Sequence, residues 1–316
     1  MLQADTSSDI GVFKFIDQRI DRLNEVYSSK KKTYPEVAFI DIGHVSGLNA
    51  KDYTKLQDID LFICVIDAFF NQDPKKALES YITDIIISDL EAVQNRVMRI
   101  EKEKAKVKTD TEEEERLLKQ CQEILSEGKL LYKAGFKKDQ LRLFSGFEYI
   151  SLRPIIAAIN LQEGANEVNL IGPVEDFCSS IGLHCIRFFG KAESEILELD
   201  PEERPKFSRE MGLERDLRED MAGLITKELR LITFFTVGEK ETKGWHLESG
   251  LPIIEAAGKI HSDMKRGFIR SEVVNYDDFI KHECNMQKVR ESGLLKVEGK
   301  EYIVKDGDIL NIRFNV

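Results

Sequence analysis

The chain has 316 residues, enough for two or three domains with a substantial hydrophobic core. Hydrophobic residues make up 42% of it and charged residues 33%, a balance typical of a soluble protein rich in exposed helix. The formal net charge of −11 argues against nucleic-acid binding by overall electrostatic attraction and leaves only a local basic patch for that purpose.

The sequence also lacks the signals of a membrane or secreted protein. No apolar run reaches the roughly 18–20 residues that a membrane helix needs. The N-terminal MLQADTSSD has no basic-then-apolar pattern of a signal peptide, so we expect a cytoplasmic protein. The five cysteines are odd in number and form no CxxC pair, which predicts neither a disulfide framework nor a metal site. Cys64 and Cys185 lie in apolar runs and are expected in the core.

Short, nearly continuous apolar runs predict strands buried on both faces, as in a parallel sheet covered by helices. There are four such runs: Glu36–Ile42, Leu61–Asp67, Pro154–Asn160 and His184–Phe189. Helices are expected around them, for example at Asp17–Tyr27 and Val174–Ser180. This order predicts an α/β core of the P-loop or Rossmann type, formed by residues 1–72 and 149–228.

A long helical insertion is expected at residues 73–148, between the second and third of these strands. The first helix begins near Pro74 and extends to about Lys108. The apolar residues of the two helices recur at spacings of three and four: Ile86, Leu90, Val93, Val97 and Ile100, then Leu117, Leu118, Cys121, Ile124 and Leu125. The pattern predicts an antiparallel, coiled-coil-like hairpin with its turn near Lys108–Thr111.

Alternate lysines mark the tip of this predicted hairpin: Lys102, Lys104, Lys106 and Lys108. They either solvate the helix end or form a patch that faces RNA or the ribosome. The acidic run Glu112–Glu115 partly offsets their charge.

The C-terminal residues 229–316 predict a small sheet crossed by one helix. Strands are expected at Leu229–Val237, around Trp245 and at FIRSEVV, and the helix at GLPIIEAAGKIHSDM. Tyr302, Val304, Ile309, Ile312 and Phe314 alternate with polar residues, and Asp306-Gly307-Asp308 supplies a turn between two strands. The aromatic residues of this region are expected in the core, with an RNA-stacking platform as the alternative: Trp245, Phe268, Tyr276 and Phe279.

The string IH-x-D-x-x-x-GFIR-x-EV-x-x-YDDF, which ends at Phe279, resembles the C-terminal TGS domain of the YchF (Obg-like ATPase) branch of the Obg GTPase superfamily. The resemblance extends over essentially the whole chain. It implies an incomplete P-loop-NTPase-like core, a helical insertion and a β-grasp TGS domain. TGS domains are regarded as binding modules for RNA, ribosomes or regulatory ligands. A basic edge is expected there: Lys259, His261, Lys265, Arg266 and Arg270.

The chain departs from the family next to that edge. Where the family has a basic, proline-containing stretch, this chain reads WHLESGLPIIEAAG, with Glu248 and Glu255 in place of a cation and an amide.

Further matches imply a nucleotide site for ATP or GTP with Mg²⁺. EVAFIDIG resembles the strand that carries the family's magnesium-side aspartate, here Asp41. NLQE, with Asn160 and Glu163, resembles the NxxE base-recognition motif, in which Glu relaxes the guanine preference in favour of adenine. GKAESE resembles the segment whose lysine, here Lys191, packs near the base. The structural alternatives are that Asn160 is a turn former at a strand end and Lys191 a surface residue.

The phosphate loop G-x-x-x-x-G-K-[ST], whose backbone N–H groups, lysine and hydroxyl hold phosphates and Mg²⁺, does not occur in these residues. None of the four Gly-Lys pairs is followed by Ser or Thr: Gly128-Lys129, Gly190-Lys191, Gly258-Lys259 and Gly299-Lys300. Instead SSDIGVFKFIDQRIDRL, from Ser7, resembles the family segment that follows the first helix. The family's first strand, phosphate loop and first helix are therefore expected to be missing.

The second switch also differs from the family. Asp41-Ile42-Gly43-His44 replaces D-x-A-G, and the loop after it is shorter. His44 is expected to be a loop or helix-cap residue. The alternative is a general base, which agrees less well with the missing phosphate clamp.

An adenine pocket without a phosphate clamp would bind in the millimolar range, about −4 kcal/mol. The sequence thus predicts a degenerate YchF-like pseudo-NTPase, a non-catalytic binding or regulatory protein that uses its TGS domain and hairpin on a ribosome, RNA or protein partner. The alternatives are a nucleotide-binding protein with residual or complemented NTPase activity, and an enzyme of another kind, for which no motif is present. Without its first strand the sheet would have an open apolar edge, so a homo-oligomer or a strand-completing partner is also expected.

Overall fold

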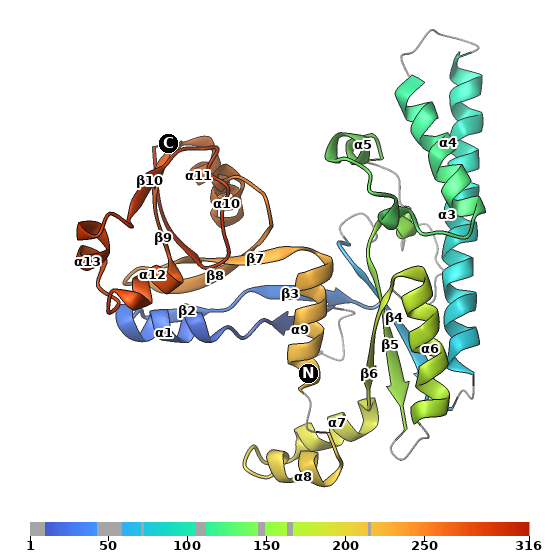
Figure 1. Ribbon diagram of the computed structural model, residues 1–316, viewed down its shortest axis with the longest axis horizontal. Helices are drawn as coiled ribbons and strands as arrows, with labels where there is room; N and C mark the ends of the chain where they lie inside the picture. The colour runs from blue at the N-terminus through green and yellow to red at the C-terminus, as the bar shows by residue number, and fades with distance from the viewer. Residues whose placement is uncertain are drawn as a thin grey trace. The chain divides into compact units, whose positions relative to one another are not determined.

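The computed structural model describes residues 10–42, 59–70, 73–104, 112–144, 149–162, 167–213 and 216–315. The chain forms two compact units (Figure 1). The first comprises residues 41–225, and the second combines the N-terminal segment up to Ile40 with residues 226–316. In the part of the chain that the structure describes, no helix is both long and apolar enough to cross a membrane.

A parallel sheet of three strands forms the centre of the first unit, in the order β4 (Phe62–Ala68), β5 (Ile155–Leu161) and β6 (His184–Phe188). Helices α3 and α6 contact each other, and they contact β4 and β6 respectively, so they cover one face. The middle strand is almost wholly buried. The three runs form parallel strands as predicted, but only β5 is buried on both faces. In β4 buried residues alternate with partly or fully exposed ones, and β6 has a single buried residue.

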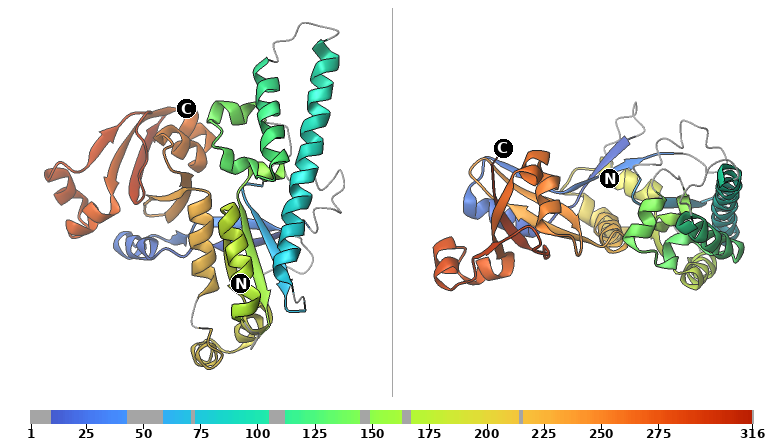
Figure 2. Two further views of the ribbon diagram at one scale, coloured as in Figure 1. Left: turned by 45° about the vertical axis from the view of Figure 1, so that its right-hand side comes forward. Right: turned by 90° about the horizontal axis from the view of Figure 1, so that it is seen from above.

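Helices α3 and α4 of the first unit pack side by side (Figure 2). Their bounds are α3 Pro74–Lys104, α4 Glu112–Ser126, α5 Lys138–Leu143, α6 Glu167–Ile181, α7 Gly190–Glu198, α8 Arg204–Glu210 and α9 Leu217–Glu228, with short 3-10 turns at Leu131–Ala134 (η2) and Ile150–Leu152 (η3). Leu117, Leu118 and Cys121 are fully buried, as their spacing predicts. Part of the lysine tip, including Lys106 and Lys108, lies outside the described residues.

A buried carboxylate joins α3 to the segment that enters β5. Asp89 is 2% exposed and accepts hydrogen bonds from the backbone N–H groups of Ile150 (3.0 Å) and Ser151 (2.7 Å). These are the first two N–H groups of η3, which have no partner within the turn. Burial raises the pKa of Asp89 to about 6, and the hydrogen bonds to Ser151 and Ile150 oppose that rise.

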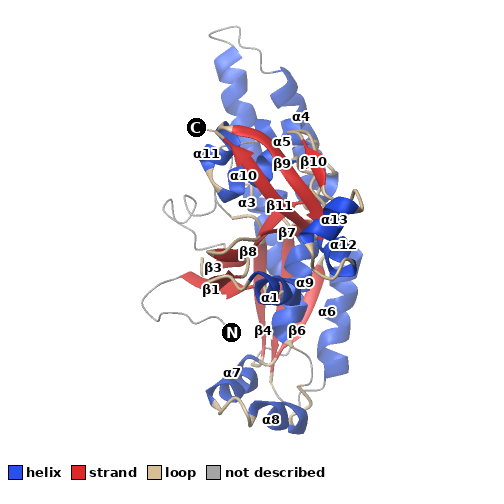
Figure 3. Cartoon of the chain, turned by 90° about the vertical axis from the view of Figure 1, so that its left-hand side faces the viewer, coloured by secondary structure: helices blue, strands red, loops and turns tan. Residues whose placement is uncertain are grey.

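A six-stranded mixed sheet forms the second unit, in the order β10-β9-β11-β7-β8-β2. Figure 3 labels β7 to β11 of this sheet. The bounds are β2 Lys31–Thr33, β7 Leu231–Thr236, β8 Glu241–Glu248, β9 Phe268–Asn275, β10 Lys296–Glu298 and β11 Asp308–Phe314. Helix α10 (Ile253–Ile260) packs its apolar residues with Phe234, Val273 and Leu310 from the sheet. Helices α1 (Gln18–Tyr27), α12 (Tyr276–Lys281) and α13 (Met286–Glu291) pack with Phe235, Val274 and Ile309, whose side chains point to the opposite face.

Several details of this region differ from the prediction. The single expected helix is two, α10 and α11 (Ser262–Arg266), because His261 between them is extended (φ −164°). The segment before the Asp306–Asp308 turn forms only one isolated bridge, between Ile303 and Pro252, instead of a strand. Phe268 and Phe279 are buried as expected, whereas Trp245 and Tyr276 are only half-buried.

The N-terminal segment belongs to the second unit, and this differs from its predicted place in the α/β core. Ile20 and Leu23 of α1 are fully buried in the core of this unit, with 0% of either residue exposed to solvent. Gly244 of β8 is needed there, since a Cβ at that position would lie 2.5 Å from Cδ1 of Ile20. Strand β2 then pairs in parallel with β8. The apolar stripe of α1 predicted a helix correctly, but a stripe does not specify which sheet covers it.

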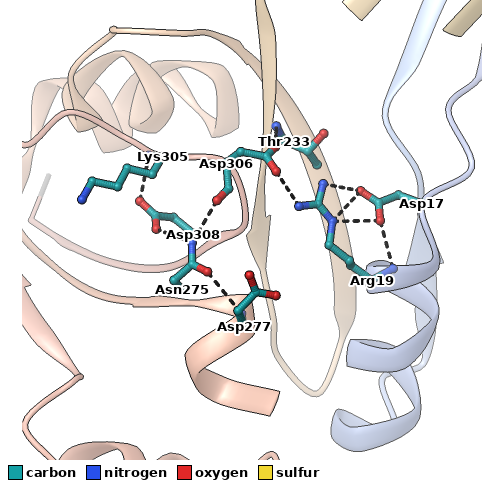
Figure 4. A network of polar contacts seen from close by, with 8 residues as sticks. All are labelled: Asp17, Arg19, Thr233, Asn275, Asp277, Lys305, Asp306 and Asp308. Carbon is teal, nitrogen blue, oxygen red and sulfur yellow. Dashed lines mark hydrogen bonds and ion pairs between the residues drawn. The ribbon is translucent and has the colours of Figure 1, made fainter. Parts of the chain in front are cut away.

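Polar contacts fix this segment to the turn before β11 (Figure 4). Asp17 caps the start of α1, and its carboxylate accepts three hydrogen bonds from the Arg19 guanidinium, two from Nε and one from Nη2. Arg19 also donates to Asp306 (2.6 Å), whose carboxylate accepts the backbone N–H of Thr233 (2.8 Å). Asn275 donates to the carbonyl of Asp306 at 2.9 Å. The turn thus bridges α1, β7 and β9.

The first predicted core strand lies elsewhere. Residues Glu36–Ile40 form β3, which pairs antiparallel with β1 (Ile10–Lys14) in a two-stranded ribbon, so its expected place in the parallel sheet is wrong. The ribbon is only partly covered: Ile10 is 51% and Val12 48% exposed. A five-residue apolar run has the same pattern in a ribbon and in a buried sheet, and periodicity does not distinguish the two.

Candidate functional site

Three side chains form a row at the carboxyl edge of the parallel sheet. In the strand register Asp67 of β4 lies beside Asn160 of β5, which lies beside Phe188 of β6. Neighbours in register point to the same face of a sheet. Because ligands of open α/β sheets bind beyond the carboxyl ends of the strands, this row is the candidate site of the first unit.

A hydrogen bond connects the predicted base-site residue Asn160 to the segment that carries Lys191. The side-chain oxygen of Asn160 accepts the backbone N–H of Gly190 at 3.0 Å, and Gly190 is the first residue of α7. Lys191 follows it and is exposed. The structure therefore brings Asn160 to the helix start that carries Lys191, as expected for two segments of one site. Their contact with a nucleotide base stays a prediction.

The loops on either side of this row are held by carboxylates that the sequence did not single out. Asp67 accepts the backbone N–H groups of Phe69 (2.8 Å) and Phe70 (3.3 Å) just beyond β4. Glu193 accepts that of Phe189 at 3.1 Å, and burial raises the pKa of its carboxyl. An Asp at the end of an apolar run is a common turn signal, which is the clue that would have identified Asp67.

The other predicted members of the site are not part of this row. Asp41 follows β3 and is exposed, and β3 pairs with β1, so Asp41 does not extend from the sheet that carries Asn160. Glu163 and His44 lie outside the described residues.

Gly190 should tolerate no side chain. A Cβ there would lie 3.0 Å from both Oδ1 of Asn160 and a ring carbon of Phe188. We expect Gly190→Ala to lower the free energy of unfolding in urea by about 1–2 kcal/mol, as overpacking does. Gly172→Ala in α6 is the matched control, since a Cβ there would meet no atom within 4 Å, and it should be neutral or slightly stabilising. Equal effects of the two substitutions would contradict the close packing at Gly190.

The predicted basic edge of the second unit is largely neutralised. Lys265 lies 2.7 Å from the Glu255 carboxylate, and Arg266 lies 2.8 Å from Asp263. His261 Nδ1 accepts the backbone N–H of Asp263. Lys259 is exposed at the end of α10. The five predicted residues thus do not form one cationic surface, because the acids between them share the same helices.

Arg270, the fifth residue of the predicted edge, lies on β9 and not on these helices. It is exposed.

Comparison with known proteins covers nearly the whole chain. Residues 231–315 match the family model YchF-GTPase_C, described as a protein of unknown function (DUF933). The chain is 29% identical to the Ribosome-binding ATPase YchF of Bacillus subtilis (strain 168), over 98% of this chain and 89% of that protein. It is 28% identical to the protein of the same name from Escherichia coli O157:H7, over 97% and 89%. The chain is thus similar to YchF proteins over nearly its whole length.

The fold agrees with this relationship. The structure of the Schizosaccharomyces pombe YchF GTPase superposes with a TM-score of 0.84 and 21% sequence identity, over 98% of this chain and 89% of that one. The likeness establishes an α/β fold of the YchF type.

A YchF-type nucleotide fits the described residues only in part. The side-chain oxygen of Asn160 is used by the Gly190 N–H, and the NH₂ group of the same amide is the donor that a base could receive. Among the described residues, the Gly-Lys pairs do not form a phosphate loop. Gly190-Lys191 begins α7, and Phe189 is the single residue between β6 and this helix. The other pairs lie after α4 (Gly128-Lys129), within α10 (Gly258-Lys259) and after β10 (Gly299-Lys300). None of these is a loop that could wrap phosphates between a strand and a helix.

Proposed function

We propose that this chain is a YchF-like ribosome-binding protein whose own 316 residues do not hydrolyse nucleotide. The observation that carries the first part is the similarity, over 98% of the chain, to a protein named as a ribosome-binding ATPase. Its C-terminal sheet, which we interpret as a TGS domain, and the α3–α4 pair are the proposed binding elements. A ribosomal partner implies a cytoplasmic location.

The non-catalytic part of the proposal rests on chemistry. Phosphoryl transfer is catalysed by positioning and by charge neutralisation around the phosphates. The four Gly-Lys pairs of the chain lack the hydroxyl residue that would hold Mg²⁺. With only Asn160, Lys191 and the predicted Glu163 on the base side, ATP or GTP would bind weakly, in the millimolar range.

A second candidate is a nucleotide-binding protein with residual NTPase activity, or with activity completed by another segment or chain. The hydrogen bond between Asn160 and Gly190 supports it, because it holds Asn160 next to the segment that carries Lys191. A strand-completing partner or a second copy also belongs to the proposal. Among the described strands β4 pairs with β5 alone, and Val65 on β4 is 63% exposed.

Two measurements test the proposal. The full chain should pellet with purified bacterial ribosomes at low salt and remain in the supernatant without them. In calorimetry with Mg²⁺, ATP and GTP should give no submicromolar binding, and no phosphate should be released. Absence from the ribosome pellet would refute ribosome binding. Submicromolar ATP binding lost in Asn160→Ala, or hydrolysis lost in Asp41→Asn, would establish the second candidate instead.

A further inference from the structure

One face of the second unit changes from apolar to cationic along its length. In the antiparallel register of β9 and β11, Val274 lies opposite Ile309, Glu272 opposite Asn311, and Arg270 opposite Arg313. Partners directly opposite share a face of the sheet. Val274 and Ile309 are buried beneath α12 and α13, at 2% and 3% exposure. Two residues further along, the same face carries Glu272 and Asn311, and four residues further along it carries the exposed pair Arg270 and Arg313.

The open end contains more positive than negative charge. Glu272 accepts a hydrogen bond from Asn311 (2.9 Å) and lies 3.4 Å from an Arg313 nitrogen and 3.7 Å from an Arg290 nitrogen. The side chains of Arg313 and Arg290 are 58% and 66% exposed. We call Arg270, Glu272, Arg290, Asn311 and Arg313 the arginine face. Three arginines against one glutamate leave an excess of two positive charges.

The pairing of Arg270 with Arg313 is unfavourable without an anion. Like charges directly opposite on neighbouring strands destabilise a sheet. Arg313 shares the Glu272 carboxylate with Arg290, whereas Arg270 has no ion pair within 4.0 Å among the described residues. A ligand anion seated between Arg270 and Arg313 would relieve the repulsion, and the fork of a guanidinium suits phosphate in particular.

We propose that the arginine face binds RNA through backbone phosphates. This inference rests on the proposed ribosome binding and names the surface that would serve it. Every cation of the face is an arginine, the side chain that binds phosphate through two parallel hydrogen bonds. A protein partner would need an apolar centre, whereas the arginine face consists of charged and polar residues. Among the described residues, exposed apolar side chains lie only at its border, at Val297 opposite Glu272 and at Ile269 and Phe314 next to Arg270 and Arg313 in the chain. The earlier basic edge is a poorer candidate, because Lys265 and Arg266 already have acidic partners.

The decisive comparison is between two double variants that remove the same charge. Arg270→Gln with Arg313→Gln alters the arginine face, and Lys265→Gln with Arg266→Gln alters the basic edge. The probes are fluorescein-labelled oligouridylate and purified bacterial ribosomes, both titrated over a range of KCl concentrations. We expect the first pair to weaken oligouridylate binding at least tenfold and to reduce the slope of log affinity against log salt by about 1.4, since each phosphate contact contributes about 0.7 for single strands. The second pair should change affinity less than twofold.

A third variant predicts a gain. Glu272→Gln keeps an acceptor for Asn311 but removes the carboxylate that engages Arg290 and Arg313, so RNA should bind more tightly and with a steeper salt dependence. A role limited to folding would give no gain. Thermal unfolding verifies that each variant is folded.

The outcomes separate this inference from the proposed function. If the wild type binds ribosomes and the double variant of Arg270 and Arg313 binds them equally well, the inference is overturned and the proposed function stands. The same holds if the chain binds ribosomes independently of salt and does not bind oligouridylate, because that result would indicate contact with a ribosomal protein. Arginine-dependent oligouridylate binding supports it even if the chain fails to pellet with ribosomes, and in that case only the proposed function falls.

Discussion

Replacing Asp89 with alanine should lower the free energy of unfolding at pH 7 by about 3 kcal/mol. The carboxylate is 2% exposed and is the acceptor for two buried backbone N–H groups, those of Ile150 and Ser151. Removing it leaves both donors without a partner, at a cost of about 1–3 kcal/mol each, partly offset because a buried charge is also removed. Urea unfolding gives the value, and Glu91→Ala, an exposed acid on the same helix, should change it by less than about 0.5 kcal/mol.

The same residue predicts a pH dependence. The pKa of Asp89 is about 6 in the folded chain and about 3.8 when unfolded. Between these values the unfolded state has lost the proton and the folded state keeps it, so the free energy of unfolding falls as the pH rises from about 4 to 6. Relative to Asp89→Asn, which does not titrate, the wild type should lose up to about 3 kcal/mol over this interval. A constant difference between the two proteins would show that the carboxyl titrates normally.

Replacing Ile20 with alanine should destabilise the C-terminal sheet by about 3–4 kcal/mol. Ile20 is fully buried and packs in the cluster that contains Phe235, Val274 and Ile309. Large-to-small substitution in such a core costs the lost burial plus the cavity left behind. Arg22→Ala is the control, because its side chain is 55% exposed and its ion pair with Glu25 lies at the surface.

The location of the effect is as informative as its size. Hydrogen exchange should lose protection in β7, β8 and β9 in the Ile20→Ala protein and keep it in β5, since α1 belongs to the unit of the C-terminal sheet. Faster exchange in β4–β6, with β7 and β8 unchanged, would instead support the assignment of residues 1–72 to the α/β core that the sequence predicted.

Local pattern predicted the elements better than their partners. The apolar runs that became β4, β5 and β6 are continuous and separated by helices, which leaves a parallel sheet as the simplest arrangement. Glu36–Ile40 has a similar composition but pairs with β1, and Lys31–Thr33, three polar residues at a sheet edge, has no strand pattern at all. Such choices depend on long-range contacts, which a short segment does not encode.

The residues of the candidate site could be predicted where the sequence contains a family motif. The remaining residues could not be predicted from the sequence. Asn160 and Lys191 were expected from resemblance, and the Asn160–Gly190 hydrogen bond brings their segments together. Asp67 depends on the register of β4 with β5, and the arginine face on that of β9 with β11. A shift of one residue in either register would move these side chains to the opposite face of the sheet. The sequence of each strand by itself therefore does not show which side chains lie together.

The parallel pairing of β2 with β8 has a consequence for how the chain folds as it is made. Thr33 and its partner Glu241 are 208 positions apart, so at about 5–20 residues per second the ribosome needs roughly 10–40 s to synthesise the strand that receives β2. During this time the first unit is complete, while Ile20 and Leu23 of α1 have no sheet to cover them. The pairing of β2 with β8 is therefore the closure of a loop that contains the whole first unit, and Ile20 and Leu23 stay uncovered until the strands of the second unit have been synthesised.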